Sequence, residues 1–170
     1  MRIQMEEISL KYVTKRLKEP DIPAIYQLCK GNPTFYFHLK TELTEEYILE
    51  DMTMLPPRKE MEDKYFFGFY QNGELTAVMD LIDGYPDADT AFIGLFIMDM
   101  KYQGRGIGSD IIEETMRYLK KAGFRHVRLA YVKGNRQSEN FWKKNAFLPT
   151  GVEAKNDRYT MVVMQRELVE

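Results

Sequence analysis

A glycine-rich segment in the second half of the chain is the part of the sequence best suited to bind a ligand. An apolar run that ends at Met98 is followed by Gly104, Gly106 and Gly108, and then by residues 107–121, which have the apolar spacing of a helix. Glycines let the backbone approach a ligand closely, and the first turn of a helix presents unpaired N–H groups at its positive end. The segment therefore predicts a phosphate or pyrophosphate site, although a tight turn without a ligand would use glycines in the same way.

Two other nucleotide-binding motifs do not fit this segment. The phosphate loop of many nucleotide hydrolases ends in Gly-Lys-Ser or Gly-Lys-Thr, but no lysine precedes Ser109, which directly follows Gly108. A dinucleotide fingerprint spaces its glycines G-x-G-x-x-G after the first strand of a βαβ unit, whereas these follow G-x-G-x-G late in the chain. A glycine loop that binds a different nucleotide remains one alternative.

The segment resembles the pyrophosphate loop of the GNAT superfamily of acyl-CoA-dependent N-acetyltransferases. The loop of that family reads Gln/Arg-x-x-Gly-x-Gly/Ala, and residues 103–108 match every specified position. The family also has Asn-x-x-Ala/Ser, an aromatic pair and Gly-Phe farther along, and this chain has Asn135 to Ser138, Phe141-Trp142 and Ala146-Phe147. The resemblance extends over most of the chain, from about residue 10 to residue 166.

The resemblance implies acetyl-CoA as a co-substrate. Amides of the glycine loop would hold its pyrophosphate, the end of the preceding strand would pair with its pantetheine arm, and Asn135 would hydrogen-bond that arm. A bulge would splay this strand from its neighbour and leave a V-shaped cleft, where a backbone amide stabilises the oxyanion formed on the thioester. The residues assigned to the coenzyme in this way are Phe96, Ile97, Met98, Gln103, Gly104, Arg105, Gly106, Ile107, Gly108, Ser109, Asn135, Ser138 and Trp142.

The chain departs from the family at Trp142. Many members have a tyrosine seven residues after the asparagine, where it acts as general acid toward the leaving thiolate. An indole N–H donates a hydrogen bond but does not deliver a proton at neutral pH. An ordinary thiol has a pKa of about 8.5, so a thiolate can leave without full protonation. We therefore expect Trp142 to form an aromatic wall beside the coenzyme and not to act as an acid.

Asp80 is the best candidate for a catalytic base. It stands within the apolar run from Val78 to Ile82, where a carboxylate must find a partner or face a cleft. Three roles follow from that position: it takes the proton of an amine substrate, it anchors the amine, or it pairs with a neighbouring group and is only structural. Aromatic and acidic residues of the segment 32–61 are candidates for the acceptor pocket, and a cationic acceptor would suit them: Phe35, Tyr36, Phe37, Glu42, Glu45 and Glu46.

The order of elements predicts a single α/β domain over residues 1–170, with a mixed, mostly antiparallel sheet flanked by helices. The strongest local signal is a hairpin around Asn72-Gly73. The apolar strand 91–98 reads as buried on both faces. We predict strands at 9–17, 65–70, 75–79, 91–98, 126–132 and 159–166, and helices at 20–29, 44–55, 107–121 and 137–145.

The composition excludes several classes of function. The 24 Lys and Arg and 26 Asp and Glu give a formal net charge of -2, whereas nucleic-acid-binding domains are usually strongly basic. Cys29 is the only cysteine and there are two histidines, so we expect neither a disulfide nor a metal site. The longest apolar run is far shorter than the ~18 residues of a membrane span, and the first residues do not form a secretion signal. We expect a cytoplasmic protein with neither nucleic-acid nor membrane partners.

These features together predict an N-acetyltransferase. It would move the acetyl group of acetyl-CoA to a primary amine of a small molecule or a peptide by direct attack, with a homodimer as the candidate assembly. Because the family's tyrosine is missing and the base is uncertain, a non-catalytic acyl-CoA-binding sensor is the alternative from another class.

Overall fold

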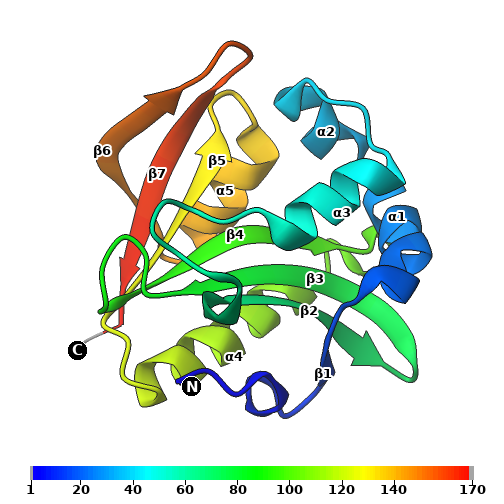
Figure 1. The fold of residues 1–170 in the computed structure, drawn as a ribbon, viewed down its shortest axis with the longest axis horizontal. Coiled ribbons are helices and arrows are strands. Elements are labelled where there is room, and N and C mark those ends of the chain that lie inside the picture. The colour runs from blue at the N-terminus through cyan, green and yellow to red at the C-terminus, as the bar shows by residue number, and fades with distance from the viewer. Residues whose placement is uncertain (1, 169–170) are drawn as a thin grey trace.

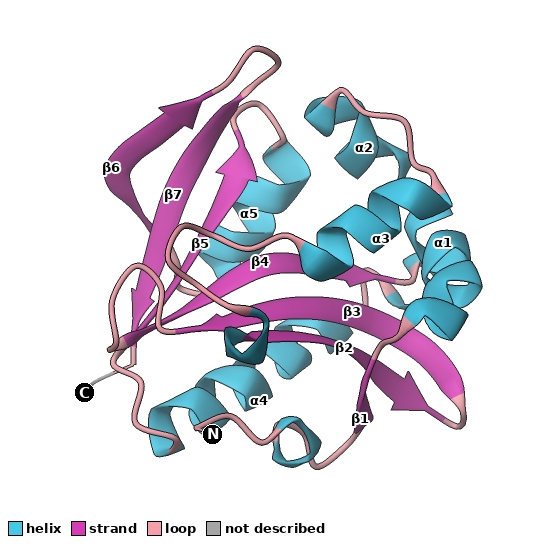
Figure 2. Ribbon diagram, viewed as in Figure 1, coloured by secondary structure: helices cyan, strands magenta, loops and turns pink. Residues whose placement is uncertain are grey.

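The computed structural model describes residues 2–168, and in this part of the chain seven strands form one sheet flanked by helices (Figures 1 and 2). The strand order is β1-β2-β3-β4-β5-β7-β6, and only the β4–β5 pair is parallel. This mixed, mostly antiparallel sheet confirms the predicted fold class. The strands are β1 (Val13–Arg16), β2 (Lys64–Gln71), β3 (Glu74–Asp83), β4 (Thr90–Met98), β5 (His126–Val132), β6 (Leu148–Lys155) and β7 (Thr160–Glu167).

Helices cover both faces of the sheet. On one face lie α1 (Ile22–Lys30), α2 (Pro33–Leu39) and α3 (Glu45–Thr53), and on the other lie α4 (Ile107–Lys121) and α5 (Arg136–Lys144), as Figure 1 shows. None of the helices within residues 2–168 combines the length and apolar character needed to cross a bilayer.

The neighbouring strands β2 and β3 separate two hydrophobic cores, because their side chains alternate between the two faces of the sheet. Phe67 and Met79 pack in the core beneath α4 and α5, whereas Phe66 and Val78 pack in the core beneath α1 to α3. Successive residues of a strand point to opposite faces of the sheet. The same alternation turns Asp80 toward the face that α1 to α3 cover.

The sequence analysis did not predict two elements, α2 and β6. Helix α2 begins at Pro33, which reads as a helix stop but occupies the first turn, where the missing N–H of proline costs nothing. Strand β6 contains Pro149 and Gly151 and is largely exposed, so it has no apolar pattern, and it pairs only with β7 at the edge of the sheet. The first strand is also shorter than predicted, since it begins at Val13.

The prediction that β4 is buried on both faces is wrong at its centre. Gly94 is exposed and Phe96 is only partly buried. The reason is a bulge at Gly94: the register against β3 changes from Asp80 opposite Leu95 to Leu81 opposite Ile93. Pairing with β5 ends at the Ile93–Leu129 pair, so beyond this point the two parallel strands no longer hydrogen-bond to each other.

Candidate functional site

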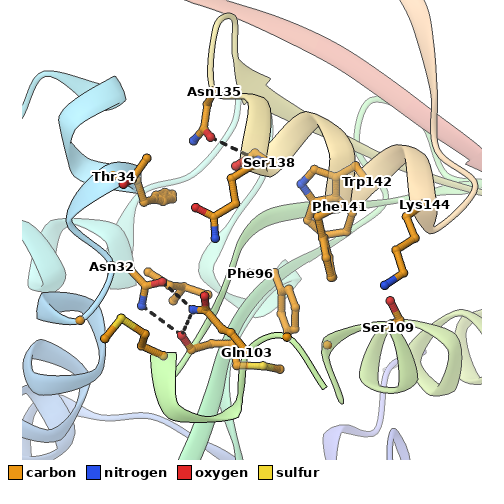
Figure 3. Close-up of a pocket in the computed structure, with 18 of the residues that line it drawn as sticks. Asn32, Thr34, Phe96, Gln103, Ser109, Asn135, Ser138, Phe141, Trp142 and Lys144 are labelled. Atoms are coloured by element: carbon orange, nitrogen blue, oxygen red, sulfur yellow. Dashed lines mark hydrogen bonds between the residues drawn. The ribbon is translucent and has the colours of Figure 1, made fainter. Parts of the chain in front are cut away.

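The separation of β4 from β5 opens a cavity of about 500 Å³. Its floor is the end of β4, and its sides are the glycine loop, the start of α5 and the segment between α1 and α2 (Figure 3). Most residues that the sequence assigned to the coenzyme line this cavity, which we call the coenzyme cleft after that expectation: Phe96, Ile97, Met98, Gln103, Gly104, Gly106, Gly108, Ser109, Asn135, Ser138 and Trp142. Two assigned residues do not line it, because Arg105 is exposed outside it and Ile107 packs against the core.

The glycine loop leaves the first turn of α4 open toward the cleft. Gly104 and Gly106 have φ angles of +78° and +77°, which residues other than glycine rarely adopt. Gly106 is the N-cap of α4, and no side chain caps the helix there. A Cβ added to Gly104 or Gly106 would meet no atom within 4 Å. The loop therefore offers uncapped N–H groups and free space, which fits a phosphate-bearing ligand.

Gln103 holds the loop in place. Its side-chain amide donates hydrogen bonds to Oδ1 of Asn32 at 2.7 Å and to the carbonyl of Met98 at 2.9 Å. Asn32 also donates to the same carbonyl at 3.0 Å, so these two side chains tie the end of β4 to the segment that follows α1 (Figure 3). Sequence reasoning missed Asn32, because its Asn-Pro context is typical of a turn.

The other side of the coenzyme cleft belongs to α5. The Oδ1 of Asn135 accepts a hydrogen bond of 3.2 Å from the backbone N–H of Ser138 and so caps the helix. At the far end of α5, Lys144 lines the cleft and points its ammonium group toward Ser109 (Figure 3). A lysine beside the helix start adds positive charge where a phosphate would bind, and sequence reasoning also missed it.

Trp142 forms an aromatic wall between the cleft and the core. It is 7% exposed, and its ring lies 4.9 Å from that of Phe141 and 5.2 Å from that of Phe147, measured between centroids. Phe96 completes the wall at 6.2 Å. Three aromatic neighbours hold the indole in one orientation.

A second cavity of about 370 Å³ adjoins the coenzyme cleft. The two share one wall, made of Phe35, Phe96, Asn135, Ser138 and Trp142. From this wall the second cavity extends beneath α2 and α3 to the edge of β7. Its lining is rich in aromatic rings and contains two carboxylates, Asp51 and Asp80.

Asp80 is paired with a buried lysine. The Nζ of Lys64 lies 2.9 Å from Oδ2 of Asp80 and donates a second hydrogen bond of 2.8 Å to the carbonyl of Met54. Burial raises the pKa of Asp80, and the ammonium of Lys64 opposes that rise. The other oxygen of Asp80, Oδ1, is buried and accepts no hydrogen bond from any described residue.

Asp51 is the second carboxylate of this cavity, and α3 supplies it. Burial and the neighbouring charge of Asp80 raise the pKa of Asp51 to about 7, although Lys64 opposes the rise. Lys64 is therefore the cation that stabilises the ionised forms of both Asp51 and Asp80. Within residues 2–168, no three His, Cys, Asp or Glu side chains are arranged as a metal site.

Some of the residues that the sequence analysis named as candidates for the acceptor pocket line the second cavity. Phe35 and Tyr36 line the second cavity, but Phe37 is 75% exposed, and Glu42, Glu45 and Glu46 are not among the lining residues. The sequence analysis did not name Asp51, although helical spacing could have indicated it. Asp51 follows the buried Ile48 by three residues and therefore lies on the inner face of α3.

Replacing Asp51 with Asn should stabilise the protein at alkaline pH. An unfolded Asp has a pKa of about 3.9, so between that pH and about 7 the native state binds more protons than the unfolded state. The free energy of unfolding of the wild type therefore falls as pH rises through this window. We expect Asp51→Asn to exceed the wild type by about 2 kcal/mol at pH near 8, as measured by urea unfolding.

The difference should shrink toward pH ~4, where Asp51 is protonated in both states. Glu50→Gln, on the exposed side of the same helix, is the matched control and should change little. If the free energy of unfolding depended on pH equally in the wild type and in Asp51→Asn, the raised pKa of Asp51 would be contradicted.

Comparison with known proteins identifies the class. The model of the acetyltransferase (GNAT) family matches residues 23–147, which is more than half of the chain. No curated protein is significantly similar to the chain in sequence. The chain therefore belongs to the GNAT acetyltransferase family and is an acyltransferase of that family.

Solved structures agree with this fold. An acetyltransferase from Thermus thermophilus has a TM-score of 0.73 at 21% identity, and the match covers 93% of this chain and 97% of that one. The ribosomal-protein-alanine N-acetyltransferase of Escherichia coli has a TM-score of 0.67 at 17% identity, covering 94% and 95%. The PaiA N-acetyltransferase of Thermoplasma acidophilum, solved with coenzyme A, has a TM-score of 0.62 at 18% identity, covering 93% and 99%.

Proposed function

We propose that this chain forms one N-acetyltransferase domain that transfers the acetyl group of acetyl-CoA to a primary amine. The observation that supports this best is the wall shared by the coenzyme cleft and the second cavity. A donor in one cavity and an acceptor in the other would meet at Phe96, Asn135 and Trp142. A protein that only senses an acyl-CoA has no need for a second cavity behind the thioester.

In this proposal the glycine loop and α4 hold the pyrophosphate of the coenzyme. The uncapped N–H groups at Gly106 and after it donate to the phosphate oxygens, and Lys144 adds a positive charge beside them. Gln103 keeps the loop close to β4 through Met98. Bound acetyl-CoA supplies an acetyl group activated as a thioester.

The second cavity binds the acceptor, a small-molecule or peptide amine, and directs its nitrogen toward the shared wall. The named substrate of the Escherichia coli relative, an alanine of a ribosomal protein, is consistent with an amine acceptor. Reaction is by direct attack, without a covalent enzyme intermediate, and the amine loses its proton to water. Asp80 anchors the acceptor, since Lys64 donates to its Oδ2 and its Oδ1 is left to accept from a cationic group.

Trp142→Phe should lower turnover by less than about tenfold, which corresponds to about 1.4 kcal/mol. Phenylalanine keeps an aromatic ring near Phe96 and Phe147 but removes the five-membered ring of the indole with its N–H, to which we assign no proton transfer. Steady-state kinetics with an accepted amine measure the effect. A loss of several orders of magnitude with coenzyme affinity intact would assign residue 142 a role in proton transfer.

Two measurements test the proposed function. Calorimetric titration with acetyl-CoA, with coenzyme A and with ATP distinguishes an acyl-CoA site from a site for another nucleotide. Release of free thiol in the presence of an amine library then distinguishes an enzyme from a sensor. Tight acetyl-CoA binding with no thiol release for any amine would overturn the catalytic assignment.

A further inference from the structure

The second cavity has more carboxylates than cationic side chains in its described lining. Asp51 and Asp80 both line it, and no Lys, Arg or His is among the described residues of its lining. Lys64 is the nearest cation, and its ammonium is already bound by Asp80 and by the carbonyl of Met54. When both carboxylates are ionised, one negative charge is left without a partner inside a largely apolar cavity.

The carboxylate of Asp80 has unused hydrogen-bonding capacity. The residue is 8% exposed, and its Oδ1 is a buried acceptor without a donor among the described residues. Buried acceptors are nearly always satisfied in native proteins. The absent donor, together with the excess negative charge, points to a cationic group that belongs to the acceptor.

The aromatic rings around these carboxylates favour the same kind of ligand. Tyr36 and Tyr47 meet edge to face with centroids 6.0 Å apart, and Tyr159 lines the same cavity. The faces of aromatic rings carry partial negative charge and attract cations. The carboxylates and the aromatic rings therefore both favour a cationic ligand.

We infer that the acceptor carries a second cationic nitrogen, which binds between Asp51 and Asp80 while its primary amine reacts at the shared wall. The inference rests on the proposed function and specifies the substrate class of the same site. Asp80 pairs across the sheet with Leu95, the residue before Phe96, so the carboxylates lie near the wall but not in it. We therefore expect an acceptor whose two nitrogens are joined by a short carbon chain.

The test compares diaminohexane with hexylamine, two acceptors that differ only in the second amine. For the wild type we expect kcat/KM to be at least about tenfold higher for diaminohexane, since a hydrogen bond to a charged group is worth that much. Asp51→Asn should remove this preference by raising the KM for the diamine at least about tenfold more than the KM for hexylamine. Glu50→Gln, which removes an exposed carboxylate from the same helix, should keep the preference.

Two results would overturn the inference. One is a wild type without preference for the diamine, and the other is an Asp51→Asn variant in which kcat/KM falls by the same factor for both amines. Calorimetric titration of diaminohexane into the protein with coenzyme A separates this inference from the proposed function. Diamine binding that weakens about tenfold or more in Asp51→Asn supports the inference even if no amine is acetylated. Acetylation of hexylamine and diaminohexane at equal rates supports the proposed function and overturns the inference.

Discussion

Gly106→Asp should weaken coenzyme binding by at least about 100-fold, or about 2.7 kcal/mol, while the fold is retained. The new carboxylate would stand at the start of α4, where it can cap the open N–H groups itself and repel the pyrophosphate. A Cβ at this position meets no protein atom within 4 Å, and aspartate tolerates a positive φ better than most residues. Calorimetric titration with coenzyme A measures the loss, and far-UV circular dichroism checks the fold.

Gly123→Asp is the matched control, because Gly123 follows the other end of α4. It also has a positive φ angle, +104°, and a Cβ added there likewise meets no atom within 4 Å. Both variants place an aspartate at a positive φ angle and add the same charge, but only the first lies in the coenzyme cleft. Wild-type coenzyme affinity in a folded Gly106→Asp protein would refute the assignment of this loop.

Lys64→Met should destabilise the protein by about 3 kcal/mol at pH near 8, because removing one partner of a buried ion pair leaves the other charge uncompensated. Lys64 is 1% exposed and is the cation on which Asp80 and Asp51 depend. At pH near 5 the loss should be smaller, because the two carboxylates can then take up protons. Urea unfolding at both pH values measures the effect.

The double variant Lys64→Met with Asp80→Asn should recover at least half of the lost stability, since it removes both members of the pair. A loss that is the same at both pH values and is not rescued by Asp80→Asn would mean that Lys64 acts only through packing. Such a result would also weaken the charge argument for a cationic acceptor.

The glycine-loop side of the coenzyme cleft was predictable from local sequence signals, whereas its α5 side was expected from the resemblance to the GNAT family. The glycine loop and α4 are adjacent in the chain, and both the turn and the helix have their own signals at Gly104, Gly106 and residues 107–121. Asn32 and Lys144 are among the lining residues that sequence reasoning missed, and they enter the cleft from distant segments. No local pattern reports which surface side chain a fold will bring to a cavity.

The second cavity was less predictable because tertiary packing creates it. Asp80 stood out as a charge in an apolar strand, but its partner Lys64 is the first residue of another strand and reads as an ordinary strand boundary. Asp51 looks like one more acid on an acidic helix until the inner face of α3 is known. The cleft itself depends on a one-residue bulge at Gly94, and glycine in a strand only hints at such a bulge.

The alternation along β2 and β3 has a consequence for how this protein can diverge. Odd-numbered residues such as Phe67 and Met79 contribute to the core beneath α4, whereas even-numbered neighbours such as Phe66 and Asp80 face the second cavity. With the acceptor in the second cavity, as we propose, mutations that alter the choice of acceptor can accumulate on one side of these strands without disturbing the packing on the other. Two duplicated copies of such a gene can acquire different acceptors while each keeps the same stable scaffold and the same acetyl donor.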